Sequence, residues 1–238
     1  MKTWIVMSLT LILCLAMAQA SDMAGDITGT IIVKRKLTKS RVTAPTGSYD
    51  QRGPAPALET DREMSRESDP LSYERSRVVV YIDSEKDGDK LLTQPITAKL
   101  EQKNRRFEQD VVVVPVGSIV SFPNLDEIFH NVFSLSKPKS FDLGNYPKGQ
   151  TRLIKFDKPG VVFVNCHLHP NMAASIVVTP NRWSVRAEPS GKFVLPNVPA
   201  GKYKLVAWHK AAGFFRQDIE VTSKGLSGVE FLIPLEER

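Results

Sequence analysis

The 238-residue sequence predicts an all-β protein. Short runs rich in Val, Ile, Phe and Tyr alternate with Gly, Pro, Asn and Asp, which is typical of strands joined by turns. None of these runs carries a sustained 3.6-residue apolar period, so we expect no long amphipathic helix. The length is enough for one or two domains with cores of their own.

The chain begins with a segment typical of a secretory signal peptide. Residues 1–20 contain one lysine, an uninterrupted apolar stretch and a final Ala-Gln-Ala before the expected cleavage point. The alternative is an uncleaved membrane anchor, but the apolar stretch is shorter than the roughly 20 residues that a spanning helix needs. We therefore expect a periplasmic protein without stable membrane insertion after cleavage, and the extracellular space is the alternative location.

Composition gives no sign of nucleic-acid binding and draws attention to one cysteine. Loss of Lys2 leaves 31 of the 32 basic residues against 26 acidic ones, a mild excess spread along the chain that does not indicate nucleic-acid binding. Cys14 lies in the signal peptide, so Cys166 is the sole cysteine of the mature chain and cannot form an internal disulfide. Burial or a metal bond should protect this thiol in an oxidising compartment.

The strands follow one another along most of the chain after the signal peptide. Their expected ranges are 27–33, 77–83, 96–102, 110–122, 151–156, 160–166, 174–179, 192–198, 202–209, 216–222 and 228–234. The interval 43–76 differs, because it contains four prolines, eleven charged residues and few large apolar side chains. We expect a long, partly disordered loop there, with one helical turn near 58–64.

Soft ligand atoms gather in the segment NCHLHPNM. Cys166, His169 and Met172 follow the pattern C-x-x-H-x-x-M on a tight loop between the strands 160–166 and 174–179. A thiolate, an imidazole and a thioether suit copper better than magnesium or calcium. His167 should point away from this group, because successive side chains alternate along an extended chain.

A further strong ligand is available upstream, where His130 stands in SFPNLDEIFHNVFS after the valine-rich strand. Two imidazoles and a thiolate with a weak axial methionine form the blue-copper arrangement that serves electron transfer. Zinc in a similar His-His-Cys site is the main alternative.

These two segments resemble the ligand regions of the cupredoxins, the family of plastocyanin, amicyanin and pseudoazurin. The resemblance covers about residues 96–179, and the spacing from cysteine to methionine is like that of the short amicyanin loop. It implies a Greek-key β-sandwich that binds one type 1 copper ion through His130, Cys166, His169 and Met172. It also implies that the Asn131 side chain supports the site by tying the two ligand loops together.

The tail resembles the second half of a carboxypeptidase-regulatory-like or transthyretin-like β-sandwich. The matching residues are Gly191, Phe193, Pro199, Gly201, Tyr203 and Leu205. The first strands of such a module are absent from the tail, and 27–33 and 77–83 are the candidates upstream. We therefore expect residues 21–92 and 181–238 to form one split sandwich, with a cupredoxin domain at 93–180 inserted in it. In the alternative, 77–83 is the first strand of the cupredoxin itself.

The expected function is transfer of single electrons between redox protein partners. The sequence shows no catalytic triad, phosphate loop or paired-carboxylate motif, so we do not expect an enzyme. One alternative is a periplasmic copper carrier or store, although the chain has no Met-rich or His-rich tract. Another is a scaffold or adhesion module with a structural metal.

Overall fold

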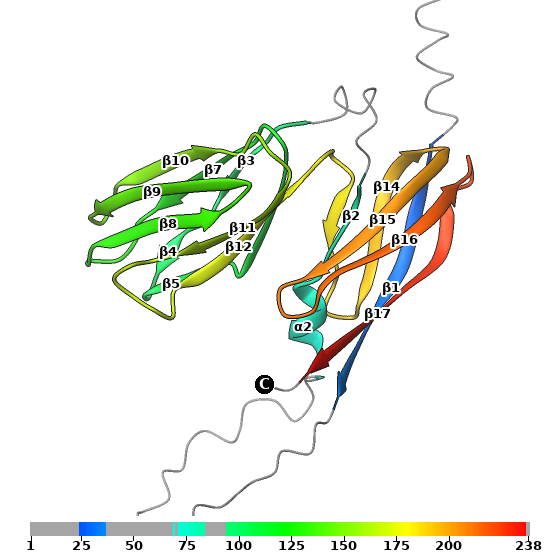
Figure 1. Cartoon of the computed structure of the whole chain (residues 1–238), viewed down its shortest axis with the longest axis horizontal. Coiled ribbons are helices and arrows are strands. Elements are labelled where there is room, and N and C mark those ends of the chain that lie inside the picture. Colours follow the sequence, from blue (N-terminus) through cyan, green and yellow to red (C-terminus); the bar gives the residue numbers. More distant parts are fainter. Residues whose placement is uncertain (1–23, 37–68, 70, 84–93, 237–238) are drawn as a thin grey trace, which may run out of the picture.

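The strands of the computed structural model form two β-sandwiches that lie side by side (Figure 1). The structure describes residues 24–36, 69, 71–83 and 94–236. The predicted signal peptide, the predicted helical turn at 58–64 and most of the predicted loop 43–76 lie outside these residues. Within them nearly every element is a strand, which confirms the all-β prediction. No helix in the described part of the chain is long and apolar enough to cross a membrane.

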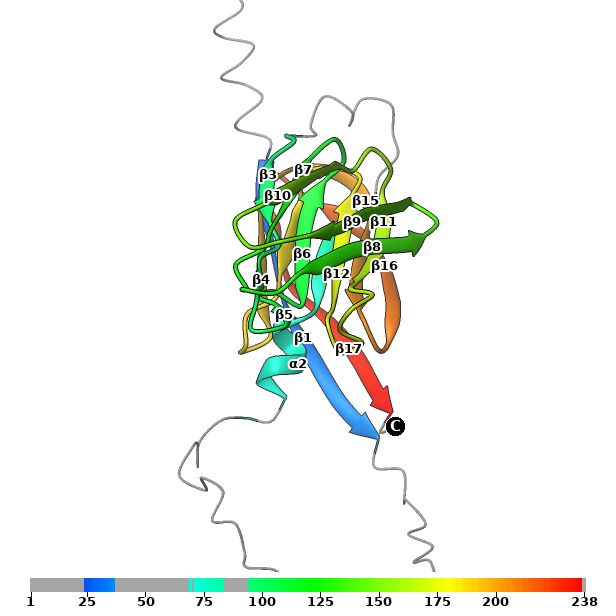
Figure 2. The same ribbon diagram turned by 90° about the vertical axis from the view of Figure 1, so that its left-hand side faces the viewer.

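The central sandwich is formed by the strands β3 to β12, and Figure 2 views it from the side opposite to the other sandwich. One sheet has the order β6-β12-β11-β8-β9, the second has the order β10-β7-β3, and β4 and β5 form a hairpin. The bounds are β3 Thr97–Lys99, β4 Gln102–Lys103, β5 Arg106–Phe107, β6 Val111–Pro115, β7 Ile119–Pro123, β8 His130–Ser136, β9 Lys139–Tyr146, β10 Thr151–Lys155, β11 Gly160–Asn165 and β12 Ala173–Thr179.

A buried apolar cluster fills the space between the two larger sheets of the central sandwich. Phe122, Tyr146 and Phe156 are its largest fully buried side chains. Cys166 and Met172 belong to the same cluster. The sandwich core therefore reaches directly to two of the predicted ligands.

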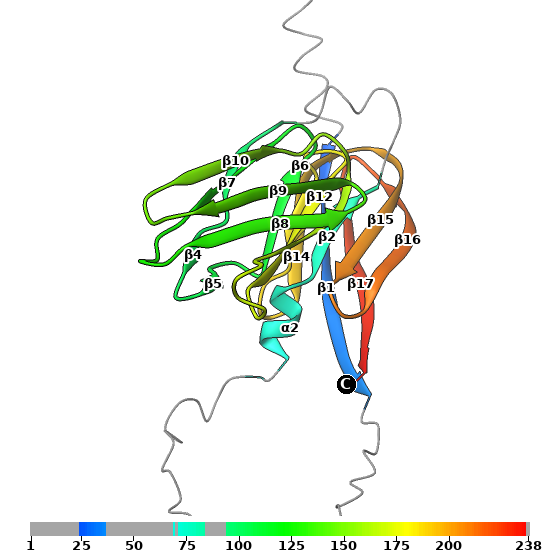
Figure 3. The same ribbon diagram turned by 60° about the vertical axis from the view of Figure 1, so that its left-hand side comes forward.

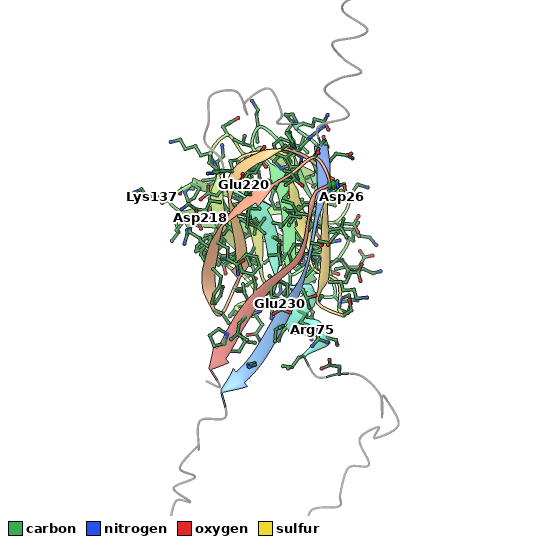
Figure 4. All side chains as sticks on the ribbon, turned by 90° about the vertical axis from the view of Figure 1, so that its right-hand side faces the viewer. Asp26, Arg75, Lys137, Asp218, Glu220 and Glu230 are labelled. Atoms are coloured by element: carbon green, nitrogen blue, oxygen red, sulfur yellow. The ribbon has the colours of Figure 1, made fainter. Side chains whose placement is uncertain are left out.

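The split sandwich is built from strands on both sides of the central one in the sequence. Its sheets have the orders β14-β1-β17 and β13-β2-β15-β16, and they enclose a second buried cluster. The bounds are β1 Ala24–Lys36, β2 Val79–Ile82, β13 Ser184–Arg186, β14 Lys192–Pro199, β15 Gly201–His209, β16 Gly213–Val221 and β17 Leu226–Glu236. Asp218, Glu220 and Glu230 lie on the outer surface of β16 and β17 (Figure 4).

The strand pairing bears on how the two sandwiches are connected. β1 pairs with β14 and β17, and β2 pairs with β13 and β15, so both upstream strands join strands of the tail. Among the described strands, β2 does not pair with β3 or β6. The alternative arrangement, in which 77–83 is a strand of the cupredoxin, requires such a pair. Both upstream strands therefore belong to the sheets of the tail, while the division into domains and the resemblance of the split sandwich to a transthyretin-like module stay predictions.

A small apolar cluster joins the sandwiches. It consists of Val111 and Val177 from the central sandwich and Val79 and Trp208 from the split sandwich, all buried. The valine run of β6 therefore has both faces covered, since Val112 and Val114 face the central core while Val111 faces this junction. This explains a continuous apolar run in place of the alternation of a half-exposed strand.

The helix α2 Ser72–Ser76 lies beside this junction (Figure 3). It occupies the last part of the interval in which the sequence predicts a loop. Tyr73 donates a hydrogen bond to the carboxylate of Asp110, next to β6, and Glu74 Oε2 lies 3.0 Å from His209 Nε2 at the end of β15. The helix forms because its polar side chains find partners in both sandwiches, and a local composition rich in charges gives no sign of this.

Buried His209 makes folding stability depend on pH. Burial lowers its pKa below the ordinary value of 6.5, although the hydrogen bond with Glu74 opposes the shift. Below about pH 6.5 the unfolded chain takes up a proton that folded His209 does not, so this part of the stability is present above 6.5 and lost as the pH falls.

We expect the free energy of unfolding of copper-free protein to decline between pH 7.5 and pH 5.5, and to decline less in His209→Gln. Urea denaturation at the two pH values measures both slopes. An equal decline of the free energy of unfolding in the wild type and in His209→Gln would contradict a lowered pKa of His209.

Candidate metal centre

The segment before β8 is shaped by one buried amide. Asn124 donates from Nδ2 to the carbonyl oxygens of Ile128 and Tyr146, at 2.9 and 3.0 Å, and its Oδ1 accepts the backbone N–H of Asp126. This turn brings the chain into β8, whose first residue is His130. The imidazole of His130 is fully buried.

The other candidate ligands lie on the loop between β11 and β12. Cys166 directly follows β11, and its backbone N–H donates to the carbonyl of Met172 at 3.2 Å. The N–H of Met172 in turn donates to the carbonyl of His169 at 2.9 Å, immediately before β12 begins. Two backbone hydrogen bonds thus close the loop, and strong strands hold both of its ends.

The structure brings the thiol and two imidazoles to one point. Cys166 Sγ lies 3.8 Å from His130 Nδ1 and 3.6 Å from His169 Nδ1. The ligand atoms of these three residues all lie within 4.8 Å of one another, and this is the one such group found in the described part of the chain. Met172 is buried beside Cys166 in the central core.

The two sulfur–nitrogen separations in this cluster fit a small metal ion. Bonds of about 2.3 Å to sulfur and 2.0–2.1 Å to nitrogen, at angles between tetrahedral and trigonal, separate the two ligand atoms by about 3.6–3.8 Å. The observed separations of 3.6 and 3.8 Å fall in this range. These two separations suit zinc and copper alike, and the addition of a thioether favours copper because sulfur ligands are soft.

Asp126 binds the far side of the His130 ring. Its Oδ2 lies 2.8 Å from His130 Nε2 and also accepts the backbone N–H of Arg105, while its Oδ1 accepts the N–H of Asn104. Burial raises the pKa of Asp126, but the hydrogen bonds from Arg105, His130 and Asn104 outweigh it and hold this pKa below the ordinary value. Sequence reasoning missed Asp126, because outside a helix a spacing of four residues does not indicate that the side chains of Asp126 and His130 are in contact.

His169 is the more accessible of the two imidazoles, since its side chain is only partly buried. Its pKa is lowered, first by desolvation and then by the positive charges that His130 and Arg105 can present. The lowered pKa favours the neutral imidazole, which is the form that binds metals.

Asn131 has a different partner from the one that the resemblance implies. Its Nδ2 donates to Asp142 Oδ1 on β9 at 2.6 Å, and its buried Oδ1 has no hydrogen-bond partner among the described residues. The side chain therefore ties β8 to β9, not the His130 segment directly to the cysteine loop. The second oxygen of Asp142 lies 3.7 Å from His167 Nε2, so the connection to that loop is indirect.

His167 points away from the cluster, as the alternation of side chains predicts. Its ring stacks on Phe133 with 3.7 Å between the centroids and an angle of 1° between the planes. The side chain is more than half exposed. It lies against the outer face of β8, while Cys166 faces the core.

Comparisons with known proteins return cupredoxins among the solved structures. Over 36% of this chain and 23% of the other, the structure is similar to the copper-containing nitrite reductase of Thermus scotoductus SA-01, with 26% identity and a TM-score of 0.34. A purple cupredoxin from Nitrosopumilus maritimus is 21% identical over 34% of this chain and 99% of its own, with a TM-score of 0.32. A mutant of amicyanin with Cu(I) is 21% identical over 42% of this chain and 97% of its own, with a TM-score of 0.33. No protein-family model and no curated protein sequence matches the chain.

Proposed function

We propose that this chain is a periplasmic type 1 copper protein that carries single electrons between redox protein partners. The observation that carries the proposal is the position of the Cys166 sulfur, within 4 Å of two imidazole nitrogens and inside the core of a β-sandwich. Copper bound by His130, Cys166, His169 and Met172 would supply the chemistry, by gaining and losing one electron.

The protein contributes a site that changes little between the two oxidation states. Cys166 follows one strand, and β12 begins directly after Met172. The loop between them is closed by backbone hydrogen bonds, and His130 is fixed by Asp126. A site held in one geometry requires little rearrangement when an electron arrives or leaves, which favours rapid transfer.

Electrons would enter and leave at the accessible edge of His169. His130 and Cys166 are buried, whereas His169 is only partly buried. Large apolar side chains adjacent to the two imidazoles in sequence are exposed: Leu168 at 46% and Phe129 at 53%. Exposed apolar side chains of this kind suit contact with a protein partner.

Two observations support electron transfer over the alternatives. A copper carrier or store has to release its ion, and a buried thiol and imidazole disfavour rapid exchange with another protein. A copper oxidase needs further ligands, but His209 is paired with Glu74 in the split sandwich and His167 is stacked on Phe133. We propose that the chain is not itself an enzyme, binds no nucleic acid and is not stably inserted in a membrane after signal cleavage.

Copper(II) added to the purified mature protein tests the proposal. We expect one equivalent to bind, an intense visible band to appear, and the band to vanish and return through repeated one-electron reduction and oxidation. Absorption spectroscopy during electrochemical cycling measures all three. A colourless protein that binds only copper(I) would contradict electron transfer and favour the carrier function.

A further inference from the structure

We infer that Asp126 is a positioning residue that orients His130 for metal binding and lowers the reduction potential of the bound ion. The inference rests on the proposed function. It adds to the four proposed ligands a residue that influences the reduction potential of the ion without binding it.

The first step concerns the tautomer of His130. Its Nδ1 is directed at the Cys166 sulfur and its Nε2 at the Asp126 carboxylate, at 3.8 and 2.8 Å. An ionised carboxylate only accepts hydrogen bonds, so the ring proton is on Nε2 and the lone pair is on Nδ1. Asp126 therefore leaves the nitrogen that faces the cluster free to bind a metal.

The second step concerns the position of the carboxylate itself. Asn104 and Arg105 form the turn of the β4–β5 hairpin, with φ values of +55° and +58°. Neither is glycine, so each adopts this left-handed conformation at a cost. Their backbone N–H groups both donate to Asp126, at 2.7 and 2.9 Å, and the hydrogen bonds support the turn. Asp126 is thus anchored by the β4–β5 hairpin, whereas the proposed ligands lie on or next to β8, β11 and β12.

The third step concerns charge. The Asp126 side chain is 13% exposed and the His130 side chain is fully buried, so water screens the pair weakly. A negative charge hydrogen-bonded to a ligand imidazole makes that imidazole a stronger donor to the metal. The negative charge of Asp126 stabilises copper(II) more than copper(I), so the reduction potential of the bound copper falls.

The neighbouring carboxylate provides a matched control. Glu127 is 82% exposed, and in the described part of the chain it forms a salt bridge with Lys148. Glu127→Gln therefore makes the same change of charge one residue away, without touching the ring of His130. Asp126→Asn removes the charge and keeps an oxygen that can accept from His130.

The test compares the full mature chain with both variants, loaded with copper. We expect Asp126→Asn to keep the visible band and to lower the ratio of copper(II) to copper(I) affinity about tenfold, a rise in potential of about 59 mV. Glu127→Gln should leave the potential unchanged. An unchanged potential in Asp126→Asn, or equal shifts in both variants, would overturn the inference.

A second measurement needs neither a variant nor copper. Nitrogen NMR of the copper-free wild-type protein reports which nitrogen of His130 carries the proton, and we expect Nε2. A proton on Nδ1 would overturn the role of Asp126 even if copper binds. If copper(II) produces no band in the wild type, the proposed function fails, and the tautomer still decides the inference about Asp126.

Discussion

Replacement of Cys166 by serine is expected to abolish the visible band of the copper(II) protein. The band requires a thiolate bonded to the ion, and the serine hydroxyl has nearly the same size without the polarisable sulfur. Cys166 lies within 4 Å of both imidazoles and its side chain is buried, and Met172 carries the one other sulfur among the described residues. Absorption spectroscopy during a copper(II) titration measures the loss.

His167→Ala is the matched control for this substitution. His167 is adjacent to Cys166, but its ring stacks on Phe133 on the outer face of β8. We expect the variant to bind one equivalent of copper(II) with an unchanged band. A band that survives in Cys166→Ser, or disappears in His167→Ala, would show that the wrong residues are assigned as ligands.

Replacement of Trp208 by alanine is expected to lower the free energy of unfolding by about 3–5 kcal/mol. Trp208 is the largest member of the junction between the two sandwiches, where it packs with Val79, Val111 and Val177. The cavity left by the indole cannot close without moving one sandwich against the other. Chemical denaturation of the copper-free protein measures the change.

Phe214→Ala serves as the control at the junction. Its ring lies 6.5 Å from that of Trp208 and is 43% exposed, so its removal leaves little cavity. We expect a loss of about 1 kcal/mol or less. Equal losses in the two variants would mean that the junction contributes no more to stability than an exposed aromatic contact.

The part of the fold that sequence reasoning predicts is the part in which side-chain pattern and burial agree. The apolar run at 160–166 forms strand β11, because this run has one face in a core. The run at 110–122, predicted as a single strand, instead forms β6 and β7 in different sheets, because the chain turns at Gly117, whose φ is +88°. Strand β9, which runs from Lys139 to Tyr146, is not among the predicted strands. It lies at the edge of its sheet, and Asp142 and Gly144 lower its strand propensity while Phe141 and Leu143 pack against the core.

The candidate site shows the same division between local and distant information. The spacing of Cys166, His169 and Met172 is local, and a loop between two strands brings such residues together. His130 is found because few histidines are available to complete the set. Asp126 escapes prediction because its role depends on the turn at Asn104 and Arg105, whose place beside β8 no sequence pattern specifies. Assignment of the four ligands stays a prediction until copper is added.

The parallel pairing of β1 with β17 determines the order in which the molecule can be assembled. Ile31 pairs with Phe231, so the first described strand meets this neighbour only after almost the whole chain has been synthesised. The central sandwich has all its strands within one continuous segment and can fold earlier. Contacts between such distant residues form slowly, because a large loop must close first. Until then β1 and β2 expose unpaired edges, so the sandwich that contains the candidate metal site is complete before the sandwich that contains the first described strand.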